Sequence, residues 1–168
     1  TTERLMLRRP GPGDGPGYRA LLTDPVIGEW LRPRPLRPFV AADGDLWLDE
    51  DARHWERFGF GPWAVLEREG GDYLGRVGLK WTDVGDEAGV EVLWAIDPRP
   101  HAEAVAAEAA AAALDFAGEL ELDRVFAMIL PINAASLRVA AKIGMERAGE
   151  VEHASFDHFL FRAEPTRG

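Results

Sequence analysis

The sequence predicts a single α/β (α+β) domain, and three observations lead to that fold class. At 168 residues the chain is long enough for one hydrophobic core, and no linker divides it, so residues 1–168 are expected to fold as one unit. A strand-like run, Val90–Ile96, passes through a Pro-rich turn into a long Ala-rich helical pattern. Two runs of β-forming residues on either side of Gly70–Asp72 predict an antiparallel hairpin.

The composition limits what the protein does. The chain has no Cys, which excludes disulfides, zinc–thiolate sites and a cysteine nucleophile, and makes a reducing cytoplasm the expected location. The formal net charge of −10 argues against nucleic acid as a partner, because such binding depends on Lys and Arg that neutralise phosphates. No apolar run approaches the roughly 20 residues of a membrane span, so no membrane partner is expected.

The first quarter of the chain is predicted to hold a strand and two short helices. Arg4–Arg9 alternates polar and apolar residues like a half-buried strand, and the Pro and Gly residues of Pro10–Asp14 end it. Tyr18–Leu31 has apolar residues near helical spacing, but Pro25 must split the pattern into two helices. Arg32–Pro38 contains three prolines and is therefore predicted to be a loop.

A longer helix and the hairpin are predicted next. Leu46–Phe58 is typical of an amphipathic helix, with acidic residues at Asp49–Asp51 in turns where the helix dipole favours anions. Its expected apolar side consists of Leu46, Trp47, Trp55 and Phe58. Gly59–Pro62 ends this helix, and the strands Trp63–Glu67 and Tyr73–Trp81 form the hairpin.

The second half of the chain repeats the order of strand and helix. A helix begins near His101, with apolar residues on one face as far as Leu120. Asp123–Ala127 follows as a strand, and Asn133 is a suitable N-cap for a helix that ends at Gly144. The start of the helix near His101 is a generic anion site, because free N–H groups and the positive end of the dipole converge there.

This half of the chain resembles the coenzyme A half of the GNAT acetyltransferases. Arg99 matches the first position of the family's Arg/Gln-x-x-Gly-x-Gly/Ala motif, Ala104 satisfies the permitted alanine, and Ala106–Ala109 matches the small residues that follow. Leu130–Ser136 and Lys142–Met145 resemble the branch that includes ribosomal-protein alanine acetyltransferases. The similarity extends over almost the whole chain, from residue 2 to residue 162.

The resemblance implies a GNAT fold, with a mixed, mostly antiparallel sheet of six or seven strands that is splayed at its centre and covered by helices on both faces. It implies transfer of an acetyl group from acetyl-CoA to a primary amine, on a small molecule or a protein N-terminus, by direct attack. A homodimer is compatible with it. The implied cofactor-binding residues are Trp94, Ala95, Ile96, Arg99, His101, Ala102, Glu103, Ala104, Val105, Asn133 and Ser136.

The chain departs from the family motif at the loop that would hold the diphosphate. Ala102 replaces the first glycine, which adds a methyl group where close approach of the backbone is wanted. Glu103 adds a carboxylate, which costs about 2–3 kcal/mol at roughly 6 Å from a phosphate charge if nothing compensates it. His101, when cationic, offsets part of that cost. An alternative function is therefore a GNAT scaffold that no longer binds coenzyme A and serves as a binding or regulatory protein, or acts on another ligand.

Glu91 and Ser136 are the candidate catalytic residues, and each has two interpretations. Glu91 is a general base if its strand buries it in the cleft, and otherwise a solvated carboxylate paired with Lys80 on the neighbouring strand, which the residue pattern favours. The hydroxyl of Ser136 could protonate the departing thiolate, or it simply occupies position N3 of a helix capped by Asn133. No Tyr follows Tyr73, so the Tyr acid of many GNAT enzymes is missing.

Two further groups of residues are candidates for an acceptor-binding site and for a metal site. Among the tryptophans, Trp30 is the one expected to reach the cleft and contact the acceptor substrate, because aromatic residues at the other spacings are usually in the core. His153, Asp157 and His158 match no firm metal motif and are expected to lie on a surface hairpin, so no metal site is predicted.

Overall fold

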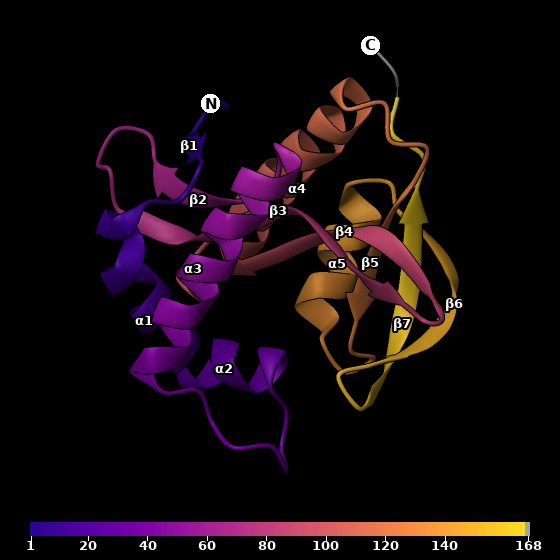
Figure 1. The fold of residues 1–168 in the computed structure, drawn as a ribbon, viewed down its shortest axis with the longest axis horizontal. Helices are drawn as coiled ribbons and strands as arrows, with labels where there is room; N and C mark the ends of the chain where they lie inside the picture. Colours follow the sequence, from indigo (N-terminus) through magenta and orange to yellow (C-terminus); the bar gives the residue numbers. More distant parts are fainter. Residues whose placement is uncertain (167–168) are drawn as a thin grey trace.

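One mixed sheet organises the computed structural model, which describes residues 1–166 (Figure 1). Within these residues the sheet has seven strands in the order β1-β2-β3-β4-β5-β7-β6. The elements in chain order are β1 (Leu5–Arg8), a 3₁₀ turn (Pro12–Asp14), α1 (Gly15–Thr23), α2 (Pro25–Leu31), α3 (Ala41–Phe58), β2 (Pro62–Glu67), β3 (Tyr73–Val84), β4 (Glu87–Ile96), α4 (Ala102–Glu119), β5 (Val125–Ile129), α5 (Ala134–Lys142), β6 (Glu146–His153) and β7 (Phe156–Ala163).

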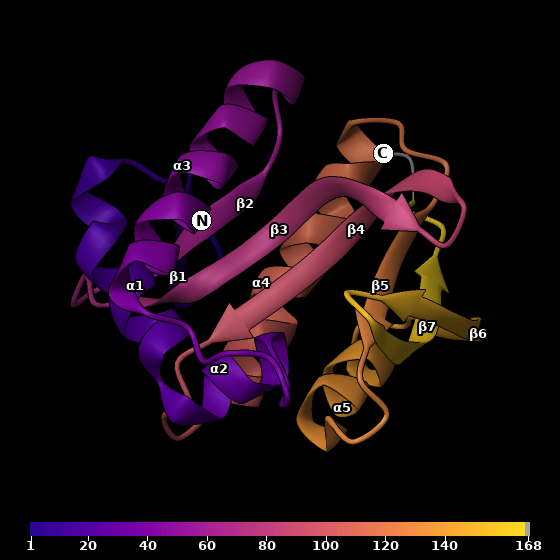
Figure 2. The same cartoon turned by 60° about the horizontal axis from the view of Figure 1, so that its bottom comes forward.

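The sheet divides between β4 and β5. Strands β1 to β4 pair antiparallel, as do β5, β7 and β6. The parallel pair β4–β5 joins the two halves, and its recorded register is the single position Glu91–Phe126. Beyond that point the two strands diverge toward their C-terminal ends (Figure 2). The expected splayed and mostly antiparallel sheet is therefore confirmed, and the divergence creates the space in which the candidate site lies.

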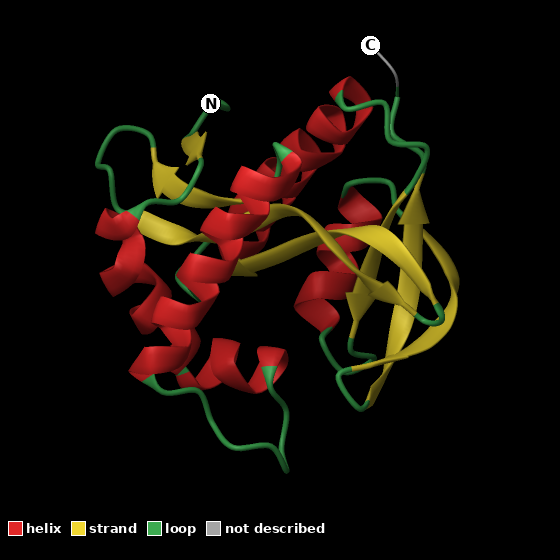
Figure 3. Cartoon of the chain, viewed as in Figure 1, coloured by secondary structure: helices red, strands yellow, loops and turns green. Residues whose placement is uncertain are grey.

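Helices cover both faces of the sheet, as predicted (Figure 3). On β3 the side chains of Val77 and Leu79 are buried on the face that carries α4. Arg76 and Lys80, which flank this pair along the strand, form ion pairs with α3 on the opposite face. Helix α4 approaches the sheet closely because its buried stripe consists of alanines, including Ala109 and Ala113 at 0% exposure.

Helix α3 differs from the prediction in its start and in its buried face. It begins at Ala41 rather than Leu46, because the Asp43 carboxylate accepts a hydrogen bond from the backbone N–H of Val40 and secures the first turn. Leu46 and Phe58, expected on the apolar side, are 60% and 38% exposed. The helix instead buries four residues that an apolar pattern does not reveal, namely Asp43, Gly44, Asp51 and His54.

The other predicted elements are confirmed with shifted ends. Pro25 separates α1 from α2, and the Asp24 carboxylate caps α2 by accepting from the N–H groups of Val26 and Ile27. The hairpin β2–β3 and the strand–helix pair β4–α4 lie where the sequence placed them. Helices that combine the length and the hydropathy of a membrane span are absent from the described part of the chain.

Candidate active site

A groove of about 240 Å³ opens where β4 and β5 separate. Its walls come from α2, β4, β5 and the starts of α4 and α5. Of the residues singled out from sequence, it contains Trp30, Glu91, Trp94, Ala95, Ile96, Ala102, Glu103, Asn133 and Ser136. A second cavity, of about 390 Å³, lies between the C-terminal half of α4 and the end of β7, away from these residues.

Glu91 lies in the groove and is not the solvated partner of Lys80 that the pattern favoured. Burial raises the pKa of the Glu91 carboxyl to about 7, although the positive charges of Arg76 and Lys80 and the backbone N–H of Met128 act in the opposite direction. Lys80 is the direct cross-strand neighbour of Glu91 in the register. Its ammonium nevertheless turns to α3, 3.5 Å from a Glu50 oxygen and 3.8 Å from Asp51. A carboxyl with a pKa near neutrality is suited to take a proton from an ammonium group.

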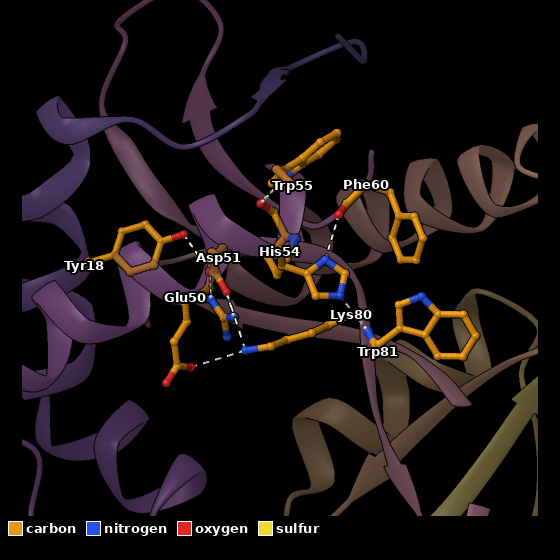
Figure 4. A network of polar contacts seen from close by, with 10 residues as sticks. Tyr18, Glu50, Asp51, His54, Trp55, Phe60, Lys80 and Trp81 are labelled. Carbon is orange, nitrogen blue, oxygen red and sulfur yellow. Dashed lines mark hydrogen bonds and ion pairs between the residues drawn. The ribbon is translucent and has the colours of Figure 1, made fainter. Parts of the chain in front are cut away.

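A buried polar network joins α1, α3 and β3 (Figure 4). Asp51 is fully buried and accepts two hydrogen bonds of 2.7 Å from Arg76 and one of 2.8 Å from the hydroxyl of Tyr18. The negative charge of Asp51 raises the pKa of Arg76, which therefore stays charged although it is 3% exposed. The sequence does not reveal this network, because its members come from three separate elements and the position of Asp51 in its helix predicts only an interaction with the helix dipole.

His54 forms a second buried link between α3 and the sheet (Figure 4). Its Nδ1 lies 2.7 Å from the carbonyl oxygen of Phe60, and its Nε2 accepts a 2.9 Å hydrogen bond from the backbone N–H of Trp81. This pairing requires the neutral tautomer with the proton on Nδ1. Burial lowers the pKa of His54, in agreement with a neutral ring. The imidazole thus anchors α3 rather than serving the groove.

The start of α4 presents backbone donors to the groove. His101 is the N-cap and has φ 74°, and the N–H of Ala102 bonds to the carbonyl of Arg99. For the N–H groups of Glu103 and Ala104, residues 1–166 provide no backbone acceptor. These two donors and the positive end of an 18-residue helix make a site for an anion.

The carboxylate of Glu103, which lies in the same helical turn as those donors, is paired with a cation. Arg138 of α5 binds it through two hydrogen bonds, one of them 3.0 Å from Nε to Oε2. This ion pair lowers the pKa of Glu103 and raises that of Arg138. The condition under which the Glu103 carboxylate would be costly, that nothing compensates it, is therefore not met, and the reason is a cation 35 residues away in the sequence.

Four residues expected to bind the cofactor are not among the groove-lining residues of the described chain, namely Arg99, His101, Ala104 and Val105. The Arg99 guanidinium turns outward, with Nε 3.2 Å from Asp97 and a terminal nitrogen 3.4 Å from the carbonyl oxygen of Tyr73. The backbone N–H of Val105 is engaged by the carbonyl oxygen of His101, at 3.0 Å.

Asn133 and Ser136 lie opposite β4. The side-chain oxygen of Asn133 accepts a 3.0 Å hydrogen bond from the backbone N–H of Ser136. Asn133 is therefore the N-cap of α5, as predicted. The indole Nε1 of Trp94 donates a 3.1 Å hydrogen bond to the Ser136 hydroxyl. Within residues 1–166 the amide nitrogen of Asn133 and the hydroxyl proton of Ser136 keep no recorded partner, so both are free to donate to a ligand.

Several groove residues were not foreseen. Helix α2 contributes an apolar wall that consists of Trp30 with Val26, Ile27 and Leu31. The sequence predicts α2 as a short helix after Pro25 but does not indicate that it lines the groove. His158 of β7 also lines the groove and is 9% exposed, although the hairpin that carries it was expected on the surface. His158 and His153 meet with ring centroids 5.5 Å apart. Among the described residues no group of three or more His, Cys, Asp or Glu is arranged to hold a metal ion.

Comparison with known protein sequences relates this geometry to a family. Residues 4–146 match the family described as Acetyltransferase (GNAT) domain. The chain is also 31% identical over 100 residues to the uncharacterized protein YkkB of Bacillus subtilis (strain 168), an alignment that covers 59% of this chain and 58% of that protein. The chain thus matches little more than half the length of this curated relative.

Solved structures share the fold over nearly the full chain. An acetyltransferase from Agrobacterium tumefaciens str. C58 is 27% identical, with a TM-score of 0.80 and coverage of 98% of this chain and 92% of that one. RimJ from Mycobacterium smegmatis, solved in complex with CoA-disulfide, is 18% identical, with a TM-score of 0.70 and coverage of 95% and 81%. At that identity the likeness to RimJ concerns the fold alone. Because the family match extends over most of its length, the chain belongs to the GNAT acetyltransferase family.

Proposed function

We propose that the protein transfers an acetyl group from acetyl-CoA to a primary amine by direct attack. The observation that carries this proposal is the position of Glu91. Its carboxyl, with a pKa raised to about 7, lies at the point where β4 and β5 part. The groove that it faces joins an apolar wall on α2 to an anion site at the start of α4. A base between two such regions is what an acyl transfer to an amine requires.

The donor side of the groove fits acetyl-CoA. The free N–H groups of Glu103 and Ala104 suit a diphosphate, and the amide nitrogen of Asn133 can donate to a carbonyl of the pantetheine arm. The strand Trp94–Ile96 lies along the groove where the parallel neighbour has departed, so its backbone groups can bind an extended ligand. The family membership and the CoA-disulfide bound to RimJ support the same ligand.

The pairing of Glu103 with Arg138 bears on the alternative function, a GNAT scaffold that has lost coenzyme A. That alternative was motivated by two changes together, the added methyl group of Ala102 and the carboxylate of Glu103. With its charge compensated by Arg138, Glu103 no longer argues against binding. Ala102 remains as one added methyl group at the helix start.

The chemistry proceeds in one transfer step. Glu91 takes a proton from the acceptor ammonium, and the neutral amine then attacks the thioester carbonyl carbon. A C–N bond forms, the tetrahedral intermediate collapses, and the C–S bond breaks. The nitrogen releases its second proton to solvent, the thiolate of CoA takes a proton from the Ser136 hydroxyl, and the Ser136 oxygen is reprotonated from solvent. The absence of Cys excludes a cysteinyl acyl-enzyme.

The acceptor is a small-molecule amine or a protein N-terminus, bound with its apolar part against α2. Isothermal titration of the protein with acetyl-CoA tests the donor half of the proposal, and transfer of labelled acetyl groups to a panel of amines and peptides tests the other half. Micromolar binding together with transfer that Glu91→Gln abolishes is the expected result. No heat and no thermal stabilisation at millimolar acetyl-CoA would remove the proposal and favour the alternative.

A further inference from the structure

The ion pair between Glu103 and Arg138 joins the two helices that flank the groove. Glu103 is in the first turn of α4, and Arg138 is in the middle of α5. The Arg138 fork binds both carboxylate oxygens, and the side chains remain 62% and 47% exposed for Arg138 and Glu103. The charge of Lys142, one turn further along α5, also acts on Glu103. Helix α5 thus directs two cations toward the start of α4.

The first turn of α4 contributes no cation of its own. Its one charged residue is Glu103, and Arg99, the basic residue just before the helix, is engaged outward by Asp97 and Asp72. The start of the helix nevertheless provides the free N–H groups of Glu103 and Ala104 for an anion. Arg138 is therefore a guanidinium held at the first turn of α4 by its contact with Glu103.

We propose that Arg138 is a binding residue for the diphosphate of the acyl donor, and that Glu103 holds its guanidinium at the groove until the donor arrives. The proposal rests on the proposed function. A diphosphate offers the same bidentate geometry as a carboxylate with more negative charge, so it competes well for an Arg fork. An exposed ion pair contributes little to stability, so opening it costs little. A cation from α5 thus stands beside the acidic residue at position 103.

The affinity for acetyl-CoA separates this role from simple neutralisation of Glu103. Isothermal titration compares the wild type with Arg138→Gln, Glu103→Gln and the double variant. We expect Arg138→Gln to weaken binding about tenfold or more, and Glu103→Gln to change it by less than about threefold. The decisive comparison is the acetyl-CoA affinity of the double variant against that of Glu103→Gln, because neither protein has a carboxylate at position 103. The double variant should bind at least about threefold more weakly, because it also lacks the cation.

If those two variants bind equally, or if Arg138→Gln binds like the wild type, Arg138 does not contact the diphosphate and the proposal is overturned. Arg147→Gln is the matched control, since it breaks another exposed Arg–Glu pair, on β6, with the same change in net charge. S-acetylpantetheine, which lacks the diphosphate, should be used equally well by all five proteins. Failure of the wild type to bind acetyl-CoA would instead count against the proposed function.

Discussion

The indole Nε1 of Trp94 donates a 3.1 Å hydrogen bond to the hydroxyl oxygen of Ser136, so that β4 and α5 are linked across the opening between the two halves of the sheet. An indole N–H can only donate, and the serine oxygen is therefore the acceptor. The hydroxyl proton of Ser136 is left for another acceptor. In the proposed reaction that acceptor is the departing sulfur, so Trp94 orients the acid.

Removal of the hydroxyl tests this assignment first. Ser136→Ala should lower kcat for acetyl-CoA by about 10–100-fold with a smaller change in KM, because proton donation assists only the step in which the thiolate leaves. Trp94→Phe, which keeps the ring but removes the donor, should show a weaker form of the same defect. Steady-state kinetics with a saturating acceptor measures both.

A double-variant cycle shows whether Trp94 acts through Ser136. In the Ser136→Ala background, Trp94→Phe should have almost no additional effect on kcat. An acetyl donor with an acidic thiol as leaving group needs no protonation, and it should restore the rate of both variants. Independent, multiplicative effects of the two changes would mean that Trp94 has only a packing role.

Glu91 predicts the pH dependence of the reaction. The base must be deprotonated to act, so kcat/KM should rise with pH through an apparent pKa near 7, the value to which burial raises Glu91. Glu91→Gln should lower kcat/KM by about 10²–10⁴-fold and remove this limb of the profile. Because Glu91→Gln leaves the donor contacts intact, the Kd for acetyl-CoA should stay within about threefold of the wild type. An unchanged acid limb in the variant would assign the titration to another group.

Trp30 predicts how the acceptor is recognised. It lines the groove from α2. Trp30→Ala should therefore raise KM for an amine with an apolar substituent by about tenfold, while the Kd for acetyl-CoA stays unchanged. Val40→Ala provides a control, since Val40 is 53% exposed and lies outside the groove. Equal losses for donor and acceptor would point to a general disturbance of α2.

The parts of the fold that the sequence predicted are those with a regular local pattern. The alternation of Val90 and Val92 with polar neighbours, and the alanine stripe of α4, each report a buried face directly. The buried face of helix α3 was not predicted, because it contains the polar residues Asp51 and His54. Their burial depends on hydrogen bonds to Arg76 and Trp81 in a distant strand. A pattern that equates buried with apolar cannot recognise such a face.

The candidate site was predictable in part of its lining but not in its charges. The resemblance implied that Trp94, Asn133 and Ser136 share one ligand, and they line one groove together with Glu91, which the residue pattern favoured as a solvated carboxylate. The state of Glu103 depends on a cation contributed by α5, and that of Glu91 on where β5 leaves β4. Both are consequences of tertiary packing that leave no local sequence signal.

The pair Asp51–Arg76 predicts a large effect on stability. Asp51→Asn leaves the buried Arg76 charge uncompensated, and loss of one member of a buried ion pair typically costs about 3–5 kcal/mol. Urea denaturation should show a loss of that size. Asp49→Asn is the matched control on the same helix, because it breaks the exposed pair Asp49–Arg53 and should change the free energy of unfolding by less than about 1 kcal/mol. Similar losses for the two variants would show that Arg76 finds another partner or solvent.

The raised pKa of Glu91 also predicts that the candidate base destabilises the fold in a pH-dependent way. The carboxyl has a pKa of about 7 in the folded state and an ordinary value of 4.5. Between these two values the unfolded chain releases a proton that the folded chain retains, so the contribution of Glu91 to stability falls as pH rises from 4.5 to 7 and then stays constant.

Glu91→Gln removes this term and should therefore stabilise the protein at pH 8 by about 1–3 kcal/mol, a range that allows for solvent in the groove. At pH 4 the Glu91 carboxyl is mostly protonated in the folded chain and in the unfolded chain. Wild type and variant should therefore unfold at nearly the same temperature. Thermal denaturation of wild type and variant from pH 4 to pH 8 measures the difference directly. A groove that keeps Glu91 well solvated would instead give parallel curves, and the candidate base would then lose the environment that makes it effective at neutral pH. A variant that is more stable yet inactive would show that the fold retains this carboxylate for its chemistry.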